Sequence, residues 1–308
     1  ISDYMRTRWM LAAMGLIAMT AGAAIVPDVR AAAMKGDFAA GEKLAAEFKK
    51  ANGVTGEYVE AFSWLGRGAL AAKQYEKAIA YADETRAVSL ELLKSRKLDD
   101  EKRLPIGFGA SIEVHGQAMA GQGRRTEAIA FLQKELAAYR GTSIRTRIQK
   151  NLHLLSLEGK VVPEIEIREW LGAKPAPLGS LKGKPVVMFF WAHWCGDCKF
   201  QGPILARLRR ENPGLTVVMP TQRYGYGKGG ADLGPAEELK YIDEVRKEFY
   251  GELLDASAPV SEENFKAWGS STTPTLVLVD KKGIVRLYHP GRLAYDELAP
   301  KVRALLGS

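Results

Sequence analysis

The two cysteines of this chain, Cys195 and Cys198, are its only cysteines, and two residues separate them. They follow an apolar run, 185–191, that is typical of a buried β-strand, and they begin a segment, 195–210, that predicts a helix. Backbone N–H groups and the helix dipole stabilise an anion at the first turn of a helix, so a cysteine there ionises more readily than a free one. The second cysteine lies one turn later, close enough for a disulfide. The spacing therefore predicts a dithiol in which the first sulfur attacks a substrate disulfide and the second resolves the mixed disulfide.

The sequence argues against three other roles for this cysteine pair. A chance structural pair is disfavoured because both cysteines of an otherwise cysteine-free chain stand at one strand-to-helix turn. A metal site with His193 would need a further ligand, and the only later histidine, His289, stands before Pro290, where an ordinary surface role is expected. A c-type haem requires a histidine directly after Cys198, and Lys199 excludes it.

The elements that must position the cysteines alternate between strand and helix over 161–308. Period-two or continuous apolar runs predict strands at 162–167, 185–191, 215–219, 275–279 and 284–288, the last two joined as a hairpin. Helical segments are predicted at 195–210, 235–249 and 295–306. This order predicts an α/β domain around a mixed sheet.

Residues 27–160 predict helices alone, because proline is nearly absent and apolar residues recur every three or four positions. The segment 75–79 resembles 125–129, with a fainter copy at 37–41, and Gly66 and Gly116 stand ahead of the two clearer copies. These features resemble tetratricopeptide helical hairpins. Equivalent positions in the copies, such as Phe38 and Tyr75, lie 37 and 50 residues apart instead of the usual spacing near 34. An irregular helical bundle therefore remains an alternative. Arrays of this kind bind partners, and no chemistry is expected there.

The N-terminal segment predicts export. Arg6 and Arg8 precede an uncharged stretch, 9–26, in which Ala21-Gly22-Ala23 offers small residues for cleavage before Ala24. Residues 1–26 are therefore expected to be a secretory signal peptide, or a membrane tether through 9–26. Either reading places the protein in the periplasm or another extracytoplasmic space.

Composition and charge exclude several other classes of protein. The 308 residues are 46% hydrophobic and 26% charged, which allows two ordinary domains and excludes a disordered or polytopic membrane protein. Two cysteines exclude a disulfide-rich scaffold. The net charge of +8 comes from basic residues interleaved with acidic ones, without a basic block, so nucleic-acid binding is not expected.

Residues 190–199, Phe-Trp-Ala-His-Trp-Cys-Gly-Asp-Cys-Lys, resemble the active-site segment of thioredoxin-fold proteins. The preceding Leu-Lys-Gly-Lys-Pro at 181–185 resembles the exported thiol–disulfide oxidoreductases of the TlpA-like group, which is related to the thioredoxin and AhpC-TSA proteins. Thr273-Pro274-Thr275, before an apolar strand, resembles the segment that carries a cis proline in that family. The resemblance covers 161–308. It implies a thioredoxin-like α/β fold with a mixed central sheet and helices on both faces. The helical pattern of 27–160 predicts an all-α helical-hairpin domain before it.

The resemblance also implies roles for individual residues. Cys195 is the expected nucleophile and Cys198 the resolving thiol. Thr273 and Pro274 shape a groove for an extended substrate segment, and Trp194 packs beside the motif.

Three residues of the motif, Gly196, Asp197 and Lys199, are expected to tune the dithiol. Asp197 disfavours a thiolate at the first cysteine and Lys199 favours one. Thioredoxin has a buried acid six residues ahead of the first cysteine, where this chain has Phe189. Deprotonation of Cys198 therefore needs another route, through water, Asp197 or Lys199. Reductase, oxidase and isomerase all remain open.

The sequence thus predicts an exported thiol–disulfide oxidoreductase that acts on cysteine-bearing proteins, draws electrons from an upstream redox partner and needs no cofactor or metal. A protein partner is expected on the helical domain, and Tyr224 and Tyr226 of the glycine-rich loop 223–230 are possible substrate contacts. The competing hypothesis is a partner-binding or metal-carrying protein that uses the thioredoxin fold as a scaffold. A third possibility is that redox state gates binding by the helical domain.

Overall fold

A computed structural model describes residues 25–307 of the chain. The predicted signal peptide or tether at 1–26 lies outside the described residues, except for Ile25 and Val26, which begin helix α1 (Ile25–Met34). None of the helices over 25–307 combines the length and the apolar character needed to cross a bilayer.

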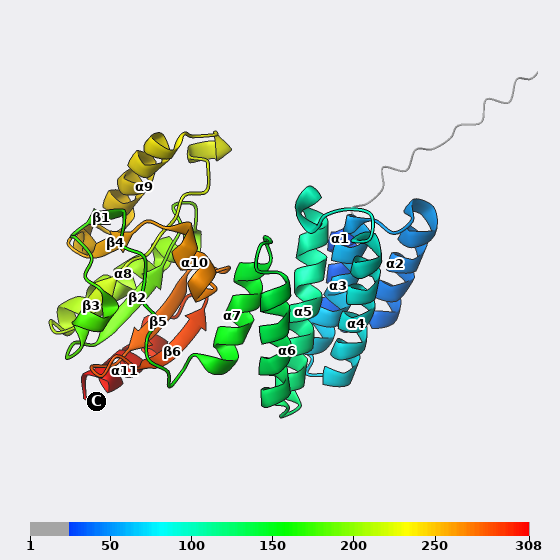
Figure 1. Cartoon of the computed structure of the whole chain (residues 1–308), viewed down its shortest axis with the longest axis horizontal. Coiled ribbons are helices and arrows are strands. Elements are labelled where there is room, and N and C mark those ends of the chain that lie inside the picture. Colours follow the sequence, from blue (N-terminus) through cyan, green and yellow to red (C-terminus); the bar gives the residue numbers. More distant parts are fainter. Residues whose placement is uncertain (1–24, 308) are drawn as a thin grey trace, which may run out of the picture.

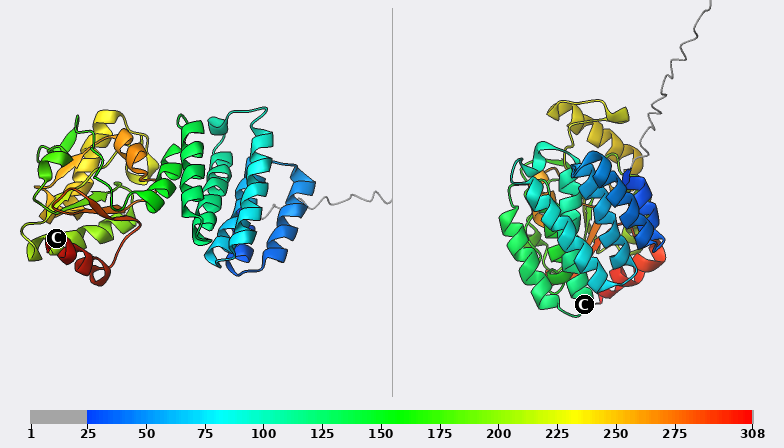
Figure 2. Two further views of the ribbon diagram at one scale, coloured as in Figure 1. Left: turned by 60° about the horizontal axis from the view of Figure 1, so that its bottom comes forward. Right: turned by 90° about the vertical axis from the view of Figure 1, so that its right-hand side faces the viewer.

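The N-terminal half of the described chain is helical, and its helices stand side by side in a row (Figure 1; Figure 2, left, blue to green). They are α1, α2 (Phe38–Asn52), α3 (Gly56–Ala71), α4 (Tyr75–Leu92), α5 (Arg103–Gly121), α6 (Arg125–Ala138) and α7 (Arg145–Ser156), with a short 3₁₀ turn at Leu98–Asp100. Their apolar faces share one core, which extends from Ile25 to Leu152.

Three of the helical hairpins share one turn geometry. Gly36, Lys73 and Gly123 have left-handed φ angles of 79°, 58° and 83°. In each turn the next residue donates its N–H to the carbonyl five residues earlier: Asp37 to Ala32 at 3.0 Å, Gln74 to Ala69 at 2.9 Å and Arg124 to Met119 at 2.9 Å. This bond ends the first helix of each hairpin. The repeated sequence segments therefore correspond to the starts of α2, α4 and α6, after one repeated turn.

Small residues let paired helices approach closely. A Cβ on Gly116 of α5 would lie 3.0 Å from the side chain of Leu132 on α6, and a Cβ on Gly66 of α3 would lie 3.4 Å from the side chain of Val114 on α5. Ala128 is fully buried in the same hairpin. The small residues singled out in the sequence are thus at helix contacts.

The C-terminal half is a mixed six-stranded sheet with the order β1-β4-β3-β2-β5-β6 (Figure 1). Its strands are β1 (Trp170–Gly172), β2 (Val186–Phe190), β3 (Thr216–Val218), β4 (Ser257–Pro259), β5 (Thr275–Val279) and β6 (Val285–Pro290). The central pairs β2–β3 and β3–β4 are parallel, whereas β5, β6 and β1 pair antiparallel. Its helices are α8 (Gly196–Glu211), α9 (Pro235–Phe249), α10 (Glu262–Trp268) and α11 (Tyr295–Leu306).

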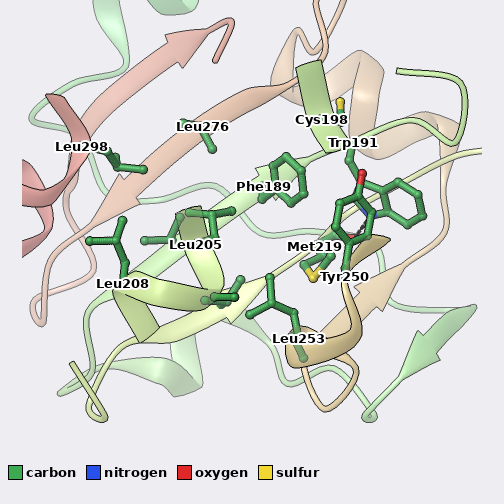
Figure 3. Packing of buried hydrophobic residues seen from close by; sticks show 14 of the residues in the cluster. Phe189, Trp191, Cys198, Leu205, Leu208, Met219, Tyr250, Leu253, Leu276 and Leu298 are labelled. Carbon is green, nitrogen blue, oxygen red and sulfur yellow. Dashed lines mark hydrogen bonds between the residues drawn. The ribbon is translucent and has the colours of Figure 1, made fainter. Parts of the chain in front are cut away.

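Alternate residues of β2 face two different cores, so helices cover both sides of the sheet. Phe189 joins Leu205, Leu298 and other residues of α8, α9 and α11 (Figure 3). Phe190 instead packs with Phe265 and Trp268 of α10. The predicted α/β fold, with a mixed sheet, helices on both faces and a preceding helical region, is confirmed.

The predicted edge strand at 162–167 is wrong. The only pairing near it is a single bridge between Val161 and Ile284. The backbone of Glu166 is hydrogen bonded to a side chain, because Asn264 accepts its N–H at 2.7 Å and donates to its carbonyl at 2.9 Å. Val162 and Ile165 are buried in the core that includes residues of α10, but they lie three positions apart, so their burial follows no strand period. The three-residue strands β1 and β4 and the short helix α10 were not predicted from the sequence.

Helix α7 joins the two halves, lying between α6 and the sheet (Figure 1). His153 on α7 lies 3.1 Å through Nε2 from the carbonyl oxygen of Ala267 at the end of α10. Its ring meets that of Tyr288 on β6 edge to face, at 5.5 Å. Gly269, with φ 64°, lies against the backbone of α7 near Lys150. The helical row is thereby docked on the face of the sheet that α10 covers.

Candidate active site

Cys195 and Cys198 form a disulfide at the N-terminus of α8, with their Cα atoms 5.2 Å apart. Cys195 is the N-cap of this helix, and its Sγ accepts the N–H of Cys198 at 3.1 Å. Cys195 is 4% exposed, and Cys198 is fully buried near Trp191 and Phe189 (Figure 3). The amide and the helix dipole stabilise negative charge on the first sulfur, whereas an apolar environment disfavours it on the second.

Strand pairing brings the Thr273–Pro274 segment to the disulfide. Phe190, at the end of β2, is opposite Thr275, at the start of β5, so the residues before β5 lie beside those after β2. The Thr273–Pro274 peptide bond is cis, and the Thr273 carbonyl oxygen lies 3.4 Å from the Sγ of Cys195. Thr273 therefore lies against Cys195, although 78 positions separate the two in the chain, and Pro274 is the residue that follows it.

Trp194 forms part of a cavity beside the motif. Its side chain is 49% exposed and meets the ring of Tyr224 edge to face at 5.5 Å. Trp194, Tyr224 and Thr273 line this cavity together with residues of α7 and α10. Tyr226 does not line it and contacts the ring of His193 at 5.4 Å instead. Of the two tyrosines named from the sequence, only Tyr224 reaches the groove.

The predicted tuning residues have partners of their own. Gly196 and Asp197 are exposed in the first turn of α8, and Asp197 lies 3.5 Å from Arg292. The ammonium group of Lys199 lies over the ring of Phe249, at 4.1 Å. Phe189 is fully buried and meets Tyr250 edge to face at 5.7 Å, so an aromatic cluster occupies the position of the missing acid.

A buried pair that the sequence analysis missed lies behind Trp194. Glu238 on α9 and His193 are each 1% exposed, and their Oε1 and Nε2 atoms are 3.4 Å apart. Glu238 also accepts the N–H groups of Tyr224 and Gly225, the latter at 2.8 Å, which fixes the glycine-rich loop. Burial lowers the pKa of His193, and the carboxylate of Glu238 opposes this effect. In the sequence Glu238 belongs to an acidic first turn that predicts a solvated surface, so only its contacts identify it.

The geometry does not favour a metal carrier. The ring of His193 is enclosed by Tyr224, Tyr226 and Tyr241, and its Nε2 faces Glu238. His289 lies in β6, opposite Leu276. Over residues 25–307, no group of three or more His, Cys, Asp or Glu side chains is arranged to hold a metal ion.

A mixed sheet with helices on both faces, and a Cys-x-x-Cys disulfide at the start of the helix after a central strand, define a thioredoxin-like fold. Residues 180–306 match the thioredoxin-like domain family. The soluble secreted antigen MPT53 of Mycobacterium tuberculosis is 40% identical over 137 residues, which are 44% of this chain and 71% of that protein. The chain therefore belongs to the thioredoxin-like family.

Other relatives match at lower identity. The thiol:disulfide interchange protein DsbE of Pseudomonas fluorescens biotype C is 28% identical over 152 residues, which are 48% of this chain and 77% of that protein. The thioredoxin-like protein YneN of Bacillus subtilis is 23% identical over 145 residues, 47% of this chain and 78% of its own. The crystal structure of a secreted M. tuberculosis disulfide oxidoreductase homologous to Escherichia coli DsbE is 21% identical, with a TM-score of 0.35. It covers 45% of this chain and 97% of that chain.

Proposed function

We propose that this protein is an exported thiol–disulfide oxidoreductase of the TlpA-like group, which exchanges its Cys195–Cys198 pair with cysteine-bearing protein substrates. One observation carries the proposal: the Sγ of Cys195 receives the N–H of Cys198 at the start of α8 and lies 3.4 Å from the carbonyl oxygen of Thr273. The nucleophile and the backbone that would hold a substrate segment are therefore adjacent. The relative DsbE of Pseudomonas fluorescens is named a thiol:disulfide interchange protein, which supports the same chemistry.

The proposed exchange conserves atoms and electrons. In the reducing direction the Cys195 thiolate attacks a substrate disulfide, whose S–S bond breaks and whose second sulfur leaves as a thiolate. The Cys198 thiolate then attacks the Cys195 sulfur, which forms the protein disulfide and releases the other substrate sulfur. Two electrons pass to the substrate, and the two protons of the protein thiols end on its thiols. The structure holds the oxidised protein, from which the reverse sequence would oxidise a substrate dithiol.

The surrounding residues would divide the remaining work. Trp194, Thr273 and Pro274 would border the substrate segment, and Gly196, Asp197 and Lys199 would tune the two sulfurs. The exchange needs no cofactor, but an upstream redox protein would restore the dithiol or the disulfide.

The remaining parts of the proposal concern the whole chain. Residues 1–26 would direct export or tether the protein, and 161–308 would form the catalytic domain. Residues 27–160 would form a tetratricopeptide-like domain that binds a protein partner, since three of its hairpins share one turn. The relative MPT53 is named a secreted protein, which supports export.

The nucleophile assignment is tested with a peptide disulfide as substrate. The Cys195→Ser variant is expected to lose exchange by at least about a thousandfold, because a hydroxyl at neutral pH cannot replace a thiolate. Cys198→Ser should instead accumulate a mixed disulfide through Cys195, visible as added mass under non-reducing conditions. Unchanged exchange by Cys195→Ser would refute the proposal.

The direction of exchange is tested by equilibrating the purified protein with glutathione buffers. A reduction potential near that of thioredoxin, about −270 mV, would indicate a reductase, and one near about −120 mV an oxidase.

A further inference from the structure

The cavity beside Trp194 is built by both halves of the molecule. Its walls come from the active-site turn (Trp194), the loop after β3 (Gln222 and Tyr224), the segment before β5 (Ser270, Ser271 and Thr273), α10 (Glu262, Phe265 and Lys266), and Thr146 on α7. Its volume is about 200 Å³. Pockets for cofactors and drug-sized ligands measure about 300–1,000 Å³, so this cavity has the size for a single side chain.

Three oxygen atoms on residues of this wall are shielded from water and have no hydrogen-bond partner within the described structure. They are the Oγ of Ser270, the Oγ1 of Thr273 and the Oε1 of Gln222. Ser270 is only 4% exposed. A buried polar atom without a partner costs about 1–3 kcal/mol, so three of them at one cavity are unusual. Because water does not reach these three atoms, a ligand in the cavity gains them only if the two hydroxyls and the Gln222 amide turn toward it. Side chains exchange between staggered rotamers, which allows this turn.

The charges at the cavity cancel, which selects an uncharged occupant. Lys266 is bound to Glu262 at 3.0 Å and to Glu263 at 2.9 Å. The rest of the wall is uncharged: it consists of the amide of Gln222, the aromatic rings of Trp194, Tyr224 and Phe265, and the Ser and Thr residues named above. A carboxylate or ammonium group would lose its water here without gaining an unpaired opposite charge.

We propose that this cavity is a specificity pocket for a carboxamide side chain, Asn or Gln, close to the reactive cysteine of the substrate protein. The inference rests on the proposed function and names the substrate feature that this site would select. A carboxamide matches the unpaired atoms: its NH₂ group donates to the Gln222 amide oxygen, which only accepts, and its oxygen accepts from the Ser270 and Thr273 hydroxyls. Thr146 makes the helical half a part of substrate selection.

The place of the pocket limits which substrate residue enters it. Thr273 provides both a wall of the pocket and the carbonyl that lies 3.4 Å from the attacking sulfur, and Trp194 directly precedes Cys195. An extended segment advances about 3.3 Å per residue. The selected side chain therefore lies one or two residues from the substrate cysteine.

Synthetic peptide disulfides test the pocket. Gln, Leu, Glu or Ala is placed in turn at each of the two positions on either side of the cysteine, and kcat/KM is measured with the full protein. At one position Gln should exceed Leu and Glu by about tenfold or more, since three hydrogen bonds with net contributions of about 0.5–1.5 kcal/mol each are gained. The Ala peptide gives an internal reference for each variant, so a general loss of activity cancels in the ratio.

Two variants locate the preference. Ser270→Ala removes one of the three hydrogen bonds and should lower the Gln-to-Ala ratio about fivefold, which corresponds to about 1 kcal/mol. Thr146→Phe fills the cavity from the helical half and should bring the ratio close to one. Thr126→Phe, the same substitution at an exposed position of α6, is the matched control and should keep the wild-type ratio.

The outcomes separate this inference from the proposed function. Equal rates for all peptides, or a Gln preference that survives both Ser270→Ala and Thr146→Phe, would overturn the pocket while leaving disulfide exchange intact. Failure of the wild-type protein to exchange any of the peptides, or oxidised glutathione, would overturn the proposed function itself and the inference with it.

Discussion

The helical half and the sheet half both bury carboxylates, but they use them differently. In the helical half Glu113 on α5 binds Arg147 and Lys150 of α7, and Glu135 on α6 binds Arg86 of α4. These pairs connect helix to helix. In the sheet half Glu238 binds two backbone N–H groups and approaches His193, two residues before Cys195.

A carboxylate thus has a different structural role in each half of the molecule. A carboxylate paired with cations across helices fixes the packing of elements that carry no reactive group. A carboxylate paired with backbone N–H groups fixes a loop, and here that loop carries Tyr224 against Trp194. The following substitutions are expected to separate stability in the first half from geometry at the site in the second.

The largest effect is expected from Glu113→Ala. Burial opposes ionisation of Glu113, but Arg147 and Lys150 outweigh it and lower its pKa to about 2. Glu113, Arg147 and Lys150 are partly buried, and removing the carboxylate that both cations share leaves two positive charges side by side. The free energy of unfolding should therefore fall by about 3–5 kcal/mol in denaturant titrations at pH 7. The disulfide exchange rate per folded molecule should stay at the wild-type value.

The control for this substitution is Glu47→Ala, which removes an exposed pair with Lys43 and should cost less than about 1 kcal/mol. Equal losses for the two variants would show that the buried pair does not hold α5 to α7.

Gly269→Ala tests the contact between the halves. Gly269 has a φ of 64°, and a Cβ there would lie 2.6 Å from the Cα of Lys150 and 2.7 Å from the carbonyl carbon of Gln149. The left-handed backbone and the overlap together should lower the free energy of unfolding by about 2–4 kcal/mol. Hydrogen exchange should rise in α7 and α10.

Gly283→Ala is the matched control, because Gly283 has a φ of 79° but its nearest neighbour would be a flexible lysine side chain at 3.9 Å. It should cost about 1–2 kcal/mol and leave exchange in α7 unchanged. If both variants behave alike, the effect at position 269 is backbone strain alone.

Glu238→Ala should loosen the active-site wall. The N–H groups of Tyr224 and Gly225 would lose the carboxylate that accepts them, at a cost of about 1–3 kcal/mol. Faster hydrogen exchange at 223–230 and a changed KM for peptide disulfides are expected. Glu244→Ala, at an exposed position of the same helix, should alter neither, and a protected loop in Glu238→Ala would contradict the assigned contacts.

The smallest effect is expected at His153, in the pH dependence of stability. Burial lowers the pKa of His153 below its usual 6.5, and the bond to Ala267 offsets this only in part. Below pH 6.5 the unfolded chain binds a proton that the folded protein does not, so stability is lost as pH falls until the folded histidine is protonated. Urea unfolding between pH 8 and 5 should show a smaller decline in His153→Gln than in wild type, whereas parallel curves would exclude this source.

Much of the fold could be predicted from patterns along the chain. The helices at 235–249 and 295–306 and the hairpin at 275–288 follow from strong local periodicity and turn residues. The alternating segment 162–167 led to a wrong prediction of a strand, because the side chain of Asn264 on α10 binds its backbone in place of a neighbouring strand. The strands β1 and β4 have three residues each, which is too short for a period to show.

The sequence by itself determined the chemistry: two cysteines at a strand-to-helix turn and a Thr-Pro pair before a buried strand. Their types and spacing are local properties of the chain. The backbone N–H groups and the dipole at a helix start stabilise negative charge on a cysteine there, whatever the rest of the fold. Only the tertiary structure decided that Glu238 lies behind the motif, that Phe189 belongs to an aromatic cluster and that Thr146 borders the groove. Contacts between residues far apart in the chain depend on how sheet and helices pack, and a charged or polar residue carries no local sign of whether packing will bury it.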